Sequence, residues 1–423
     1  MLQEQASIPR TETKADSTLL PNLFWRPLHH ASLHVLKRLL RNENITIVFP
    51  DGARTVIGSA ECDAPVWHIH SFYSLPRMLL NPWYRIGSHY VRGLWHVENG
   101  SLADLLAILV RVGKNSEQHS AFGRIIFWVR RTLFAYQQRY GAQRSIKNVE
   151  QHYDSGDELF RSFLDSGLNY TCADFEHGAS NIDDAQMTKL RNALKRVRLM
   201  PGHRLLEIGS GWGALSRLAC VEYGANVTAL TLSKNQIKYS RELAATLQIS
   251  TNLKYFLEDY RRHEIHKECI YDRVMSIGML EHVGLWQLKS YFCEISRLLK
   301  PDGIALIHTI SRRHAGVTNP WIERHIFPGG YIAQDAEILK AAEDAGLSIT
   351  EHSHVYALAN YITTLQHWHC RFCHSWPLLH KRGYPLHVRR TYEFYFAASE
   401  AAFRELDMRA VQYIFRKKIV GRL

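Results

Sequence analysis

The sequence has no apolar stretch that approaches the roughly 20 residues of a membrane-spanning helix. Its run LLAILV, Leu105 to Val110, has the length of a buried helix turn. Residues 1–20 are polar and lack the basic start and the apolar core of a secretory signal. We therefore expect a cytoplasmic protein without a membrane span, preceded by a disordered tail over residues 1–20.

Paired cysteines and a balance of charge are also missing. The seven cysteines form no disulfide framework, and an odd number in a reducing compartment implies free thiols. Acidic residues number 40 against 52 Lys and Arg, so the net charge is +12. Such an excess of positive charge favours an anionic partner, either nucleic acid or anionic lipid headgroups. The alternative is a basic surface that only keeps the protein soluble.

At 423 residues, 46% of them hydrophobic, the chain is long enough for two or more cores. Residues 45–58 predict a hairpin with an Asp-Gly turn, residues 66–70 a strand, and Ser101 caps an expected amphipathic helix. We therefore predict a small α+β domain over residues 21–121. A basic amphipathic helix follows over 122–145, and its mix of apolar residues and arginines fits a membrane surface or a linker packed on the next domain.

From about residue 202, strands and helices alternate. The strand candidates are RLLEIG, NVTALTL, LKYFLED, YDRVMSIG and GIALIHTI. This order predicts an α/β fold with a Rossmann-like, mostly parallel sheet covered on both faces, in a domain over residues 146–423. Aromatic-rich, helix-like material over about 312–406 interrupts the alternation and is expected to cover the site. Ligands of such sheets bind at the carboxyl ends of the strands.

The turn Gly209 to Gly213 is the first of these strand ends. Glycine permits backbone angles closed to other residues and lets a ligand approach the main chain, so strand, turn and helix indicate a nucleotide-sized site. A dinucleotide fingerprint needs a later third glycine and an acid about 20 residues on. The second strand ends instead in Thr231, Leu232 and Ser233, which disfavours NAD. A tight turn without a ligand stays the plain alternative.

Further motifs stand at the other strand ends and before the sheet. They are QHYD (Gln151 to Asp154), NYTCADF (Asn169 to Phe175), TLSKNQ (Thr231 to Gln236), EDYR (Glu258 to Arg261), SIGMLEHVG (Ser276 to Gly284) and LIHTI (Leu306 to Ile310). In order and spacing the chain from about Lys147 resembles the cyclopropane-fatty-acyl-phospholipid synthases and the related mycolic acid cyclopropane synthases. GLWHVENGSLADLL resembles the smaller N-terminal domain of the phospholipid-acting members, which implies a lipid-docking role for residues 21–121.

The resemblance implies S-adenosylmethionine as cofactor. The glycine turn would receive its methionine moiety, with the helix N-terminus favouring the carboxylate, and Asp259 would accept a hydrogen bond from the adenine amino group. Tyr170 and Thr171 would close over the cofactor. The implied cofactor-binding residues are Tyr170, Thr171, Gly209, Ser210, Gly211, Gly213, Thr231, Leu232, Ser233, Gln236 and Asp259.

The resemblance also implies the reaction. The π electrons of a cis double bond in an unsaturated acyl chain attack the sulfonium methyl, and the resulting carbocation loses a proton to close the ring. In the family the base is a bound bicarbonate, which is held by four side chains and by a backbone amide. The matching catalytic residues are Cys172, Glu281, His308 and Tyr361, and the matching amide is that of Ile310. Taken singly, Cys172 is better explained as a buried thiol, Glu281 as a helix cap and His308 as a core histidine, and only their occurrence together in the order of the family favours the catalytic roles.

One position differs from the family pattern, and one segment resembles a metal-binding motif. Ser399 stands where many members have a cysteine, so we place it outside the catalytic set. HWHCRFCH, His367 to His374, has one C-x-x-C pair but lacks the second half of a zinc motif, so we expect no metal.

The expected partners are an anionic membrane surface, on which the protein docks peripherally at the inner face, and an unsaturated phospholipid. No nucleic acid is expected, because the polar acceptor motif of a nucleic-acid methyltransferase is missing after the fourth strand. A homodimer is left open. The alternatives are transfer of a methyl group to a lipid or small amine without ring closure, and a non-catalytic lipid- or cofactor-binding relative.

Overall fold

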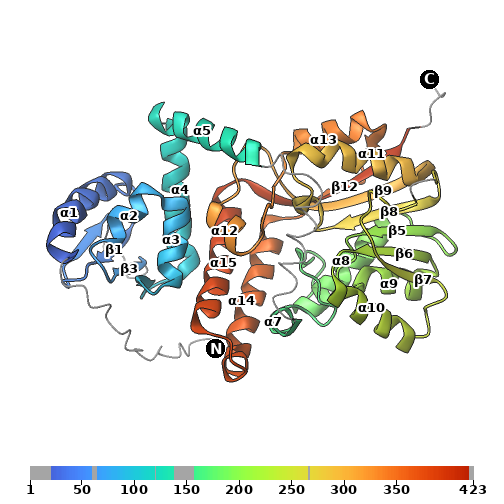
Figure 1. The fold of residues 1–423 in the computed structure, drawn as a ribbon, viewed down its shortest axis with the longest axis horizontal. Coiled ribbons are helices and arrows are strands. Elements are labelled where there is room, and N and C mark those ends of the chain that lie inside the picture. Colours follow the sequence, from blue (N-terminus) through green and yellow to red (C-terminus); the bar gives the residue numbers. More distant parts are fainter. Residues whose placement is uncertain (1–20, 60–63, 120, 138–156, 265–266, 419–423) are drawn as a thin grey trace.

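The structure is a computed structural model that describes residues 21–59, 64–119, 121–137, 157–264 and 267–418 (Figure 1). The expected disordered tail, residues 138–145 of the expected linker helix and the motif Gln151 to Asp154 lie outside these residues.

A small α+β unit forms one end of the molecule, and its sheet has the order β2-β1-β3-β4. Its elements are α1 (Pro21–Leu39), β1 (Ile45–Val48), β2 (Arg54–Ile57), β3 (Val66–Ile69), α2 (Ser74–Leu80), α3 (Pro82–Val91), β4 (Trp95–Val97) and α4 (Leu102–His119). The predicted hairpin is confirmed, since β1 and β2 pair antiparallel with Val48 opposite Arg54. The predicted cap is confirmed too, because the Asp104 amide donates to Ser101 Oγ at 3.0 Å. Helix α5 (Ala121–Gln137) then leads away from α4.

A sheet of eight strands forms the other end, in the order β10-β12-β9-β8-β5-β6-β7, with β11 paired to β12. Strands β5 to β9 run parallel where they pair, and β12 joins β9 antiparallel. This topology confirms the predicted Rossmann-like α/β class, and all five predicted strands are present. The strands are β5 (Arg204–Ile208), β6 (Asn226–Thr231), β7 (Leu253–Leu257), β8 (Tyr271–Ile277), β9 (Leu299–Arg312), β10 (Leu347–Ile349), β11 (His354–Val355) and β12 (Met408–Lys417).

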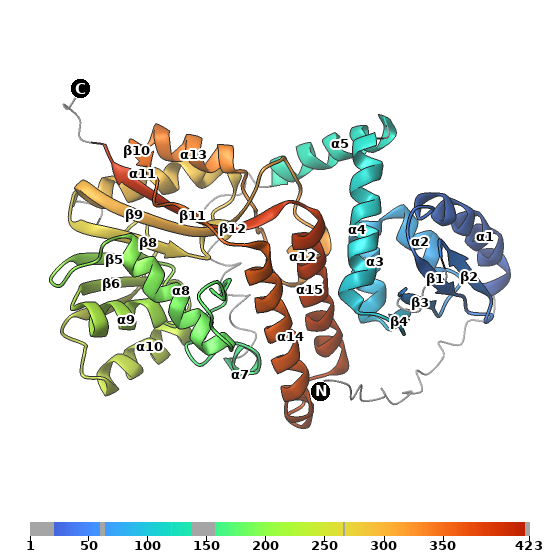
Figure 2. The ribbon, with the colours of Figure 1, turned by 180° about the vertical axis from the view of Figure 1, so that it is seen from behind.

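Helices cover both faces of this sheet (Figures 1 and 2). Leu194 of α8, Leu218 of α9 and Ile237 of α10 pack in one core, and Phe292 of α11 and Ile338 of α13 pack in the other. The helices of these two layers are α8 (Ile182–Arg196), α9 (Ala214–Tyr223), α10 (Lys234–Thr246), the short 3₁₀ helices η1 (Leu280–His282) and η2 (Leu285–Gln287), α11 (Leu288–Leu298) and α13 (Asp335–Asp344). The short α7 (Asp157–Arg161) instead packs in the core that contains α14 and α15. The sheet is thereby buried on both sides, as its apolar strands require.

Between the two ends lie α12 (Pro320–His325), α14 (Leu358–Lys381) and α15 (Leu386–Glu405) (Figure 2). The expectation that residues 312–406 are helical is wrong in part, because β10 and β11 lie within this range and pair with β12. Residues of α14 and α15 share one continuous hydrophobic core with the N-terminal sheet and α4. A Cβ added at Gly87 of α3 would lie 2.7 Å from Phe394 and 2.8 Å from Trp321. The N-terminal unit therefore packs closely against α12 and α15.

None of the helices within the described residues combines the length and hydropathy needed to cross a bilayer.

Candidate functional site

A cavity opens at the carboxyl ends of β5, β6, β7 and β8, where a doubly wound fold binds its ligand. Most of the predicted cofactor-binding residues line it. They are Tyr170, Thr171, Gly209, Ser210, Gly211, Thr231, Leu232, Gln236 and Asp259. Two predicted residues, Gly213 and Ser233, lie beside the cavity and are not among its lining residues.

The glycine turn gives the cavity its floor. Gly209 and Gly211 have φ angles of +78° and +51°, which glycine adopts without strain. A Cβ added at Gly211 would meet nothing within 4 Å, so the turn leaves open space in which a ligand can approach the main chain. Gly213 instead begins α9 in the left-handed conformation, and its carbonyl accepts a hydrogen bond from the Tyr255 hydroxyl at 3.3 Å. Its role visible in the structure is to start the helix.

The end of β6 supplies neutral polar groups. Thr231 Oγ1 donates to Gln236 Oε1 at 2.8 Å, which fixes two cavity-lining side chains against each other. Ser233 is the N-cap of α10, and its hydroxyl accepts a hydrogen bond from the Gln236 amide at 3.4 Å. Ser233 therefore orients Gln236 rather than facing the cavity itself.

Asp259 lies in the cavity wall with its carboxylate already engaged. Arg261 binds both oxygens, with Nε donating to Oδ1 at 2.9 Å and Nη2 to Oδ2, and the Arg261 amide donates to Oδ1 at 3.0 Å. Burial opposes the charge on Asp259, but the hydrogen bonds from Arg261 outweigh it and lower the pKa of the carboxyl. Arg261 also lines the cavity, and sequence reasoning did not single it out.

Two buried charged side chains beside the cofactor cavity were missed by sequence reasoning. Lys189 of α8 is fully buried and donates to Thr171 Oγ1 at 2.7 Å, and burial lowers its pKa to about 8. Glu207 of β5 lines the cavity, and burial raises its pKa to about 7 although Ser216 donates to it. Glu207 could have been found, because an acid inside the apolar strand LLEIG is unusual. Lys189 could not, because no local sequence pattern predicts that a helical lysine is buried.

The four predicted catalytic residues come from four segments that are far apart in sequence, and the structure brings them close together. Cys172 and Tyr361 belong to one small cluster with Tyr356 and Ala410, and the His308 ring lies 5.5 Å from that of Tyr356. Ile310, two residues along β9 from His308, contacts Glu281 through its amide. The raised pKa of Tyr361, caused mainly by burial, also reflects the nearby Cys172 and Glu281. The structure therefore brings all four into one region.

Glu281 is the acid of this group. Its Oε1 accepts a hydrogen bond from the Ile310 amide at 2.6 Å, and the expected role of this amide as a donor to an anion stays a prediction. Within the described part of the chain, its Oε2 is buried without a hydrogen-bond partner. Burial raises the pKa of Glu281, which favours the protonated form. An unpaired buried carboxyl oxygen is costly and indicates a place for a polar ligand.

Burial drives the other three groups toward their neutral forms as well. It raises the pKa of the Cys172 thiol and of the Tyr361 hydroxyl, and it lowers the pKa of His308 well below its usual value. Each neutral side chain carries one proton on a heteroatom. The region thus offers hydrogen-bond donors of low charge inside an apolar surrounding.

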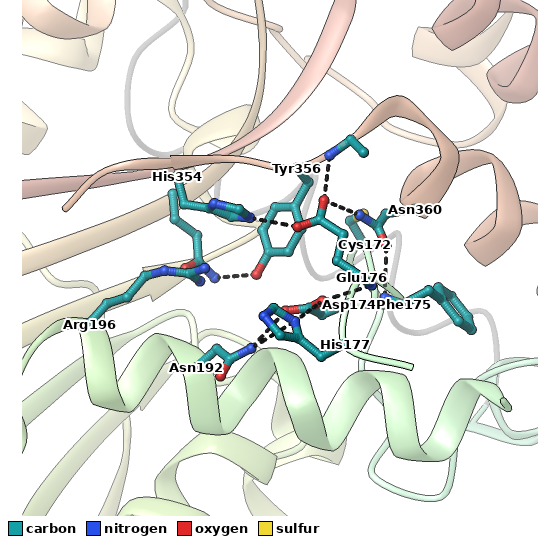
Figure 3. A network of polar contacts seen from close by, with 12 residues as sticks. Cys172, Asp174, Phe175, Glu176, His177, Asn192, Arg196, His354, Tyr356 and Asn360 are labelled. Carbon is teal, nitrogen blue, oxygen red and sulfur yellow. Dashed lines mark hydrogen bonds and ion pairs between the residues drawn. The ribbon is translucent and has the colours of Figure 1, made fainter. Parts of the chain in front are cut away.

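A polar network fixes the loop that carries Cys172 (Figure 3). Glu176 Oε1 accepts from the amide of Ala357 and from Nδ2 of Asn360, both at 2.6 Å, and His354 lies 3.3 Å from Oε2. Asn360 Oδ1 in turn accepts from the Phe175 amide at 2.7 Å. The start of α14, which carries Tyr361, is thereby held against the Cys172 loop.

An aromatic wall separates the cofactor cavity from the body of α14 and α15. Tyr170 lines the cavity, and its hydroxyl donates to the Tyr395 hydroxyl at 2.9 Å. Its ring packs on Trp368 and Phe163 at centroid distances of 5.2 and 5.7 Å. Such apolar surroundings suit a hydrocarbon chain better than a polar substrate.

Comparison with known proteins places the chain among enzymes. A family model described as mycolic acid cyclopropane synthetase matches residues 141–413. Cyclopropane-fatty-acyl-phospholipid synthase of Escherichia coli K12 is 31% identical over 363 residues, which are 86% of this chain and 90% of that protein. The tuberculostearic acid methyltransferase UfaA1 of Mycobacterium tuberculosis is 29% identical over 406 residues, covering 89% and 90%.

Solved structures agree. The mycolic acid cyclopropane synthase CmaA1, complexed with SAH and CTAB, superposes with a TM-score of 0.55 at 30% identity, over 64% of this chain and 98% of that one. With this fold and a glycine-turn cavity at its strand ends, the protein is an S-adenosylmethionine-dependent methyltransferase. More narrowly, the chain belongs to the mycolic acid cyclopropane synthetase family.

Proposed function

We propose that the protein transfers a methylene group from S-adenosylmethionine to the cis double bond of an unsaturated phospholipid acyl chain, forming a cyclopropane fatty acid. The observation that carries the proposal is the buried Glu281, whose Oε2 has no partner among the described residues, beside Cys172, His308 and Tyr361. An alkene has no proton for a base to remove before it attacks. A proton acceptor is needed only afterwards, deep in an apolar pocket.

The residues of the cofactor cavity fit S-adenosylmethionine, which supplies an electrophilic sulfonium methyl when bound. The open space at Gly211 accommodates its approach to the main chain, and the N-terminus of α9 favours its carboxylate. Thr231 and Gln236 offer hydrogen bonds of neutral groups. Tyr170 and Thr171 line the side of the cavity toward Cys172, so they are suited to close over the cofactor.

The second region fits a small anion such as bicarbonate, which supplies a base for the ring-closing proton when bound. Cys172, His308 and Tyr361, in their neutral forms, would each donate a hydrogen bond to it, and Glu281 Oε2 would bind it by donating or accepting. Aromatic rings nearby, such as the stacked pair Tyr361 and Phe403 at 3.9 Å, would stabilise positive charge on the acyl chain.

The test is incubation with methyl-labelled S-adenosylmethionine and vesicles of unsaturated phospholipid, followed by mass spectrometry of the fatty acids. Cyclopropanation adds one methylene and removes the alkene. A methylated product that keeps a double bond would instead support a lipid methyltransferase without ring closure, which the similarity to a tuberculostearic acid methyltransferase favours as the second candidate. Retained cofactor binding with no labelled lipid or amine product would contradict both and leave the non-catalytic relative.

We further infer that the protein docks on an anionic membrane surface through α5. Five exposed apolar side chains follow one stripe of this helix: Ile125, Trp128, Val129, Leu133 and Tyr136, each between 53% and 64% exposed. The opposite side is anchored, since Arg130 pairs with Glu117 at 2.8 Å and Phe134 packs on Tyr331. Arg131 lies over the Trp128 ring at 5.2 Å, so a cation borders the apolar stripe. An apolar stripe with basic neighbours suits the interface of an anionic bilayer.

Vesicle sedimentation tests this surface. Combined Trp128→Ala and Leu133→Ala is expected to weaken binding to anionic vesicles by about tenfold or more, because two apolar side chains no longer enter the interface. Val221→Ala, at an equally exposed valine on α9, is the matched control. Equal binding of the double variant and the control would remove α5 from the docking surface.

Equal binding of the wild type to neutral and anionic vesicles at low salt would contradict an electrostatic contribution to membrane docking. The absence of a nucleic-acid partner and the peripheral location at the inner membrane face stay predictions, and the homodimer stays open. Mobility-shift, cell-fractionation and light-scattering experiments test them.

A further inference from the structure

His308 has a buried polar partner that the reaction scheme leaves unexplained. Gln412 of β12 stands directly opposite His308 of β9 in the antiparallel register, and its side chain is fully buried. Its Nε2 lies 3.2 Å from His308 Nδ1 and 2.9 Å from the Tyr356 hydroxyl. On the other side of the amide, Arg196 Nη1 lies 2.6 Å from Gln412 Oε1. Figure 3 shows Arg196 reaching from α8 toward Tyr356.

The chemistry of these groups fixes the direction of each hydrogen bond. A guanidinium can only donate, so the Gln412 atom that faces Arg196 must be the oxygen. The NH₂ group of the amide must then face His308 and Tyr356. Because this NH₂ group can only donate, His308 Nδ1 must accept and carries no proton.

These directions also determine which ring nitrogen of His308 carries the proton. A neutral imidazole carries one proton, and burial together with Lys189 and Arg196 holds His308 neutral by lowering its pKa. With Nδ1 accepting, the proton resides on Nε2, the ring nitrogen that Gln412 does not occupy. The opposite tautomer would require the amide to turn its NH₂ group against Arg196.

We propose that Arg196 and Gln412 are positioning residues that fix His308 in the tautomer protonated on Nε2, so that the ring presents a hydrogen-bond donor to the region of Cys172, Glu281 and Tyr361. The proposal that His308 Nε2 donates a hydrogen bond to a bound anion rests on the proposed function, because an anion is bound by hydrogen-bond donors and repelled by lone pairs. The tautomer itself does not depend on the proposed function.

The direct test is nitrogen-15 NMR of the full-length protein labelled at histidine, with the His308 signals identified by their loss in His308→Gln. In the wild type, Nδ1 is expected to give the shift of an unprotonated ring nitrogen and Nε2 that of a protonated one. A proton on Nδ1, or rapid exchange between the two tautomers, would overturn the proposal.

Two variants extend the test. In Gln412→Glu the introduced carboxylate can only accept, so the His308 proton is expected to move to Nδ1. Turnover should fall by roughly 10- to 100-fold, the range seen for residues that orient metal-binding histidines. The KM for S-adenosylmethionine should stay unchanged, because Gln412 does not line the cofactor cavity. In Gln412→Leu, which avoids a new charge, both tautomers are expected to be populated.

The matched control is Tyr413→Phe, which alters the next residue of β12 on the opposite face. Its hydroxyl bonds Ser311 and Asp335 and not His308. This variant should keep the Nε2 proton and the turnover. Loss of turnover in both Gln412 variants with the Nε2 tautomer retained would overturn the proposal in favour of a purely structural role. A tautomer that shifts as expected in an enzyme that makes no cyclopropane would support the assignment while overturning the proposed function.

Discussion

The cofactor cavity differs in construction from the region of Cys172, Glu281, His308 and Tyr361, where we propose that an anion binds (the anion region). The cavity draws its predicted residues mainly from short loops that directly follow β5, β6 and β7. The anion region takes Cys172, Glu281, His308 and Tyr361 from a loop, a 3₁₀ turn, a strand and a helix that are far apart in sequence. One region therefore depends on local backbone geometry, and the other on the whole fold.

The two regions also treat charge differently. Asp259 in the cavity keeps its ionised form through Arg261, whereas Cys172, Glu281 and Tyr361 have raised pKa values because they are buried. In their neutral forms these groups would be able to donate hydrogen bonds to the proposed anion. Removing one group from each region should therefore give different kinds of loss.

The largest expected effect is in the anion region. Glu281→Gln should lower turnover by roughly 10²- to 10⁴-fold, the range for lost acid–base catalysis, because the amide cannot take both protonation states and would hold the proposed base less well. Affinity for S-adenosylhomocysteine, measured by calorimetry, should change little, since Glu281 does not line the cavity. Glu294→Gln, at a surface acid of α11 paired with Arg297, is the control. An unchanged lipid product would refute the role of Glu281.

An intermediate effect concerns stability and pH at Glu207. Its pKa is raised from 4.5 to about 7 by burial, so the folded state holds its proton where the unfolded chain has released it. The free energy of unfolding of the wild type should therefore fall, relative to Glu207→Gln, as pH rises from about 4.5 to about 7. The difference should reach on the order of 3 kcal/mol.

Urea unfolding at several pH values without cofactor checks this slope. Glu222→Gln is the control of opposite sign, since the hydrogen bond from Arg191 lowers the pKa of Glu222. The contribution of Glu222 is therefore lost as pH falls. Parallel pH profiles for the wild type and Glu207→Gln would contradict the expectation.

The smallest expected effect separates two glycines of one turn. Both have positive φ, so alanine costs about 1–2 kcal/mol at either position. At Gly209 a Cβ would also lie 2.8 Å from Met279, whereas at Gly211 it would project into open space. Gly209→Ala should therefore lower the melting temperature more, and Gly211→Ala should lose more affinity for S-adenosylhomocysteine. Equal effects of both variants in both measurements would contradict this division.

Sequence reasoning worked where the determinants are local. The hairpin at Asp51, the cap at Ser101 and the five parallel strands are each specified by neighbouring residues, and the structure confirms them. Gly224, in the left-handed conformation, likewise ends α9.

It failed where the determinants are distant. Strand β12 pairs antiparallel with β9, which is distant in sequence, so no pattern in the residues near Gln412 predicts its contact with His308. Lys189 and the engagement of the Ile310 amide by Glu281 were missed for the same reason. The predicted division into domains and the roles of the site residues stay predictions.

The core shared by the N-terminal sheet, α4, α14 and α15 has a consequence for how the molecule unfolds. Arg111 of α4 bridges Glu43 and Glu405 at 2.8 and 2.7 Å, which ties the N-terminal unit to the end of α15. Chain segments that share a core lose their packing together, so a single cooperative transition in calorimetry is expected. A chain cut between α4 and the sheet would expose the apolar faces of α14 and α15, and aggregation would accompany the loss of the N-terminal part.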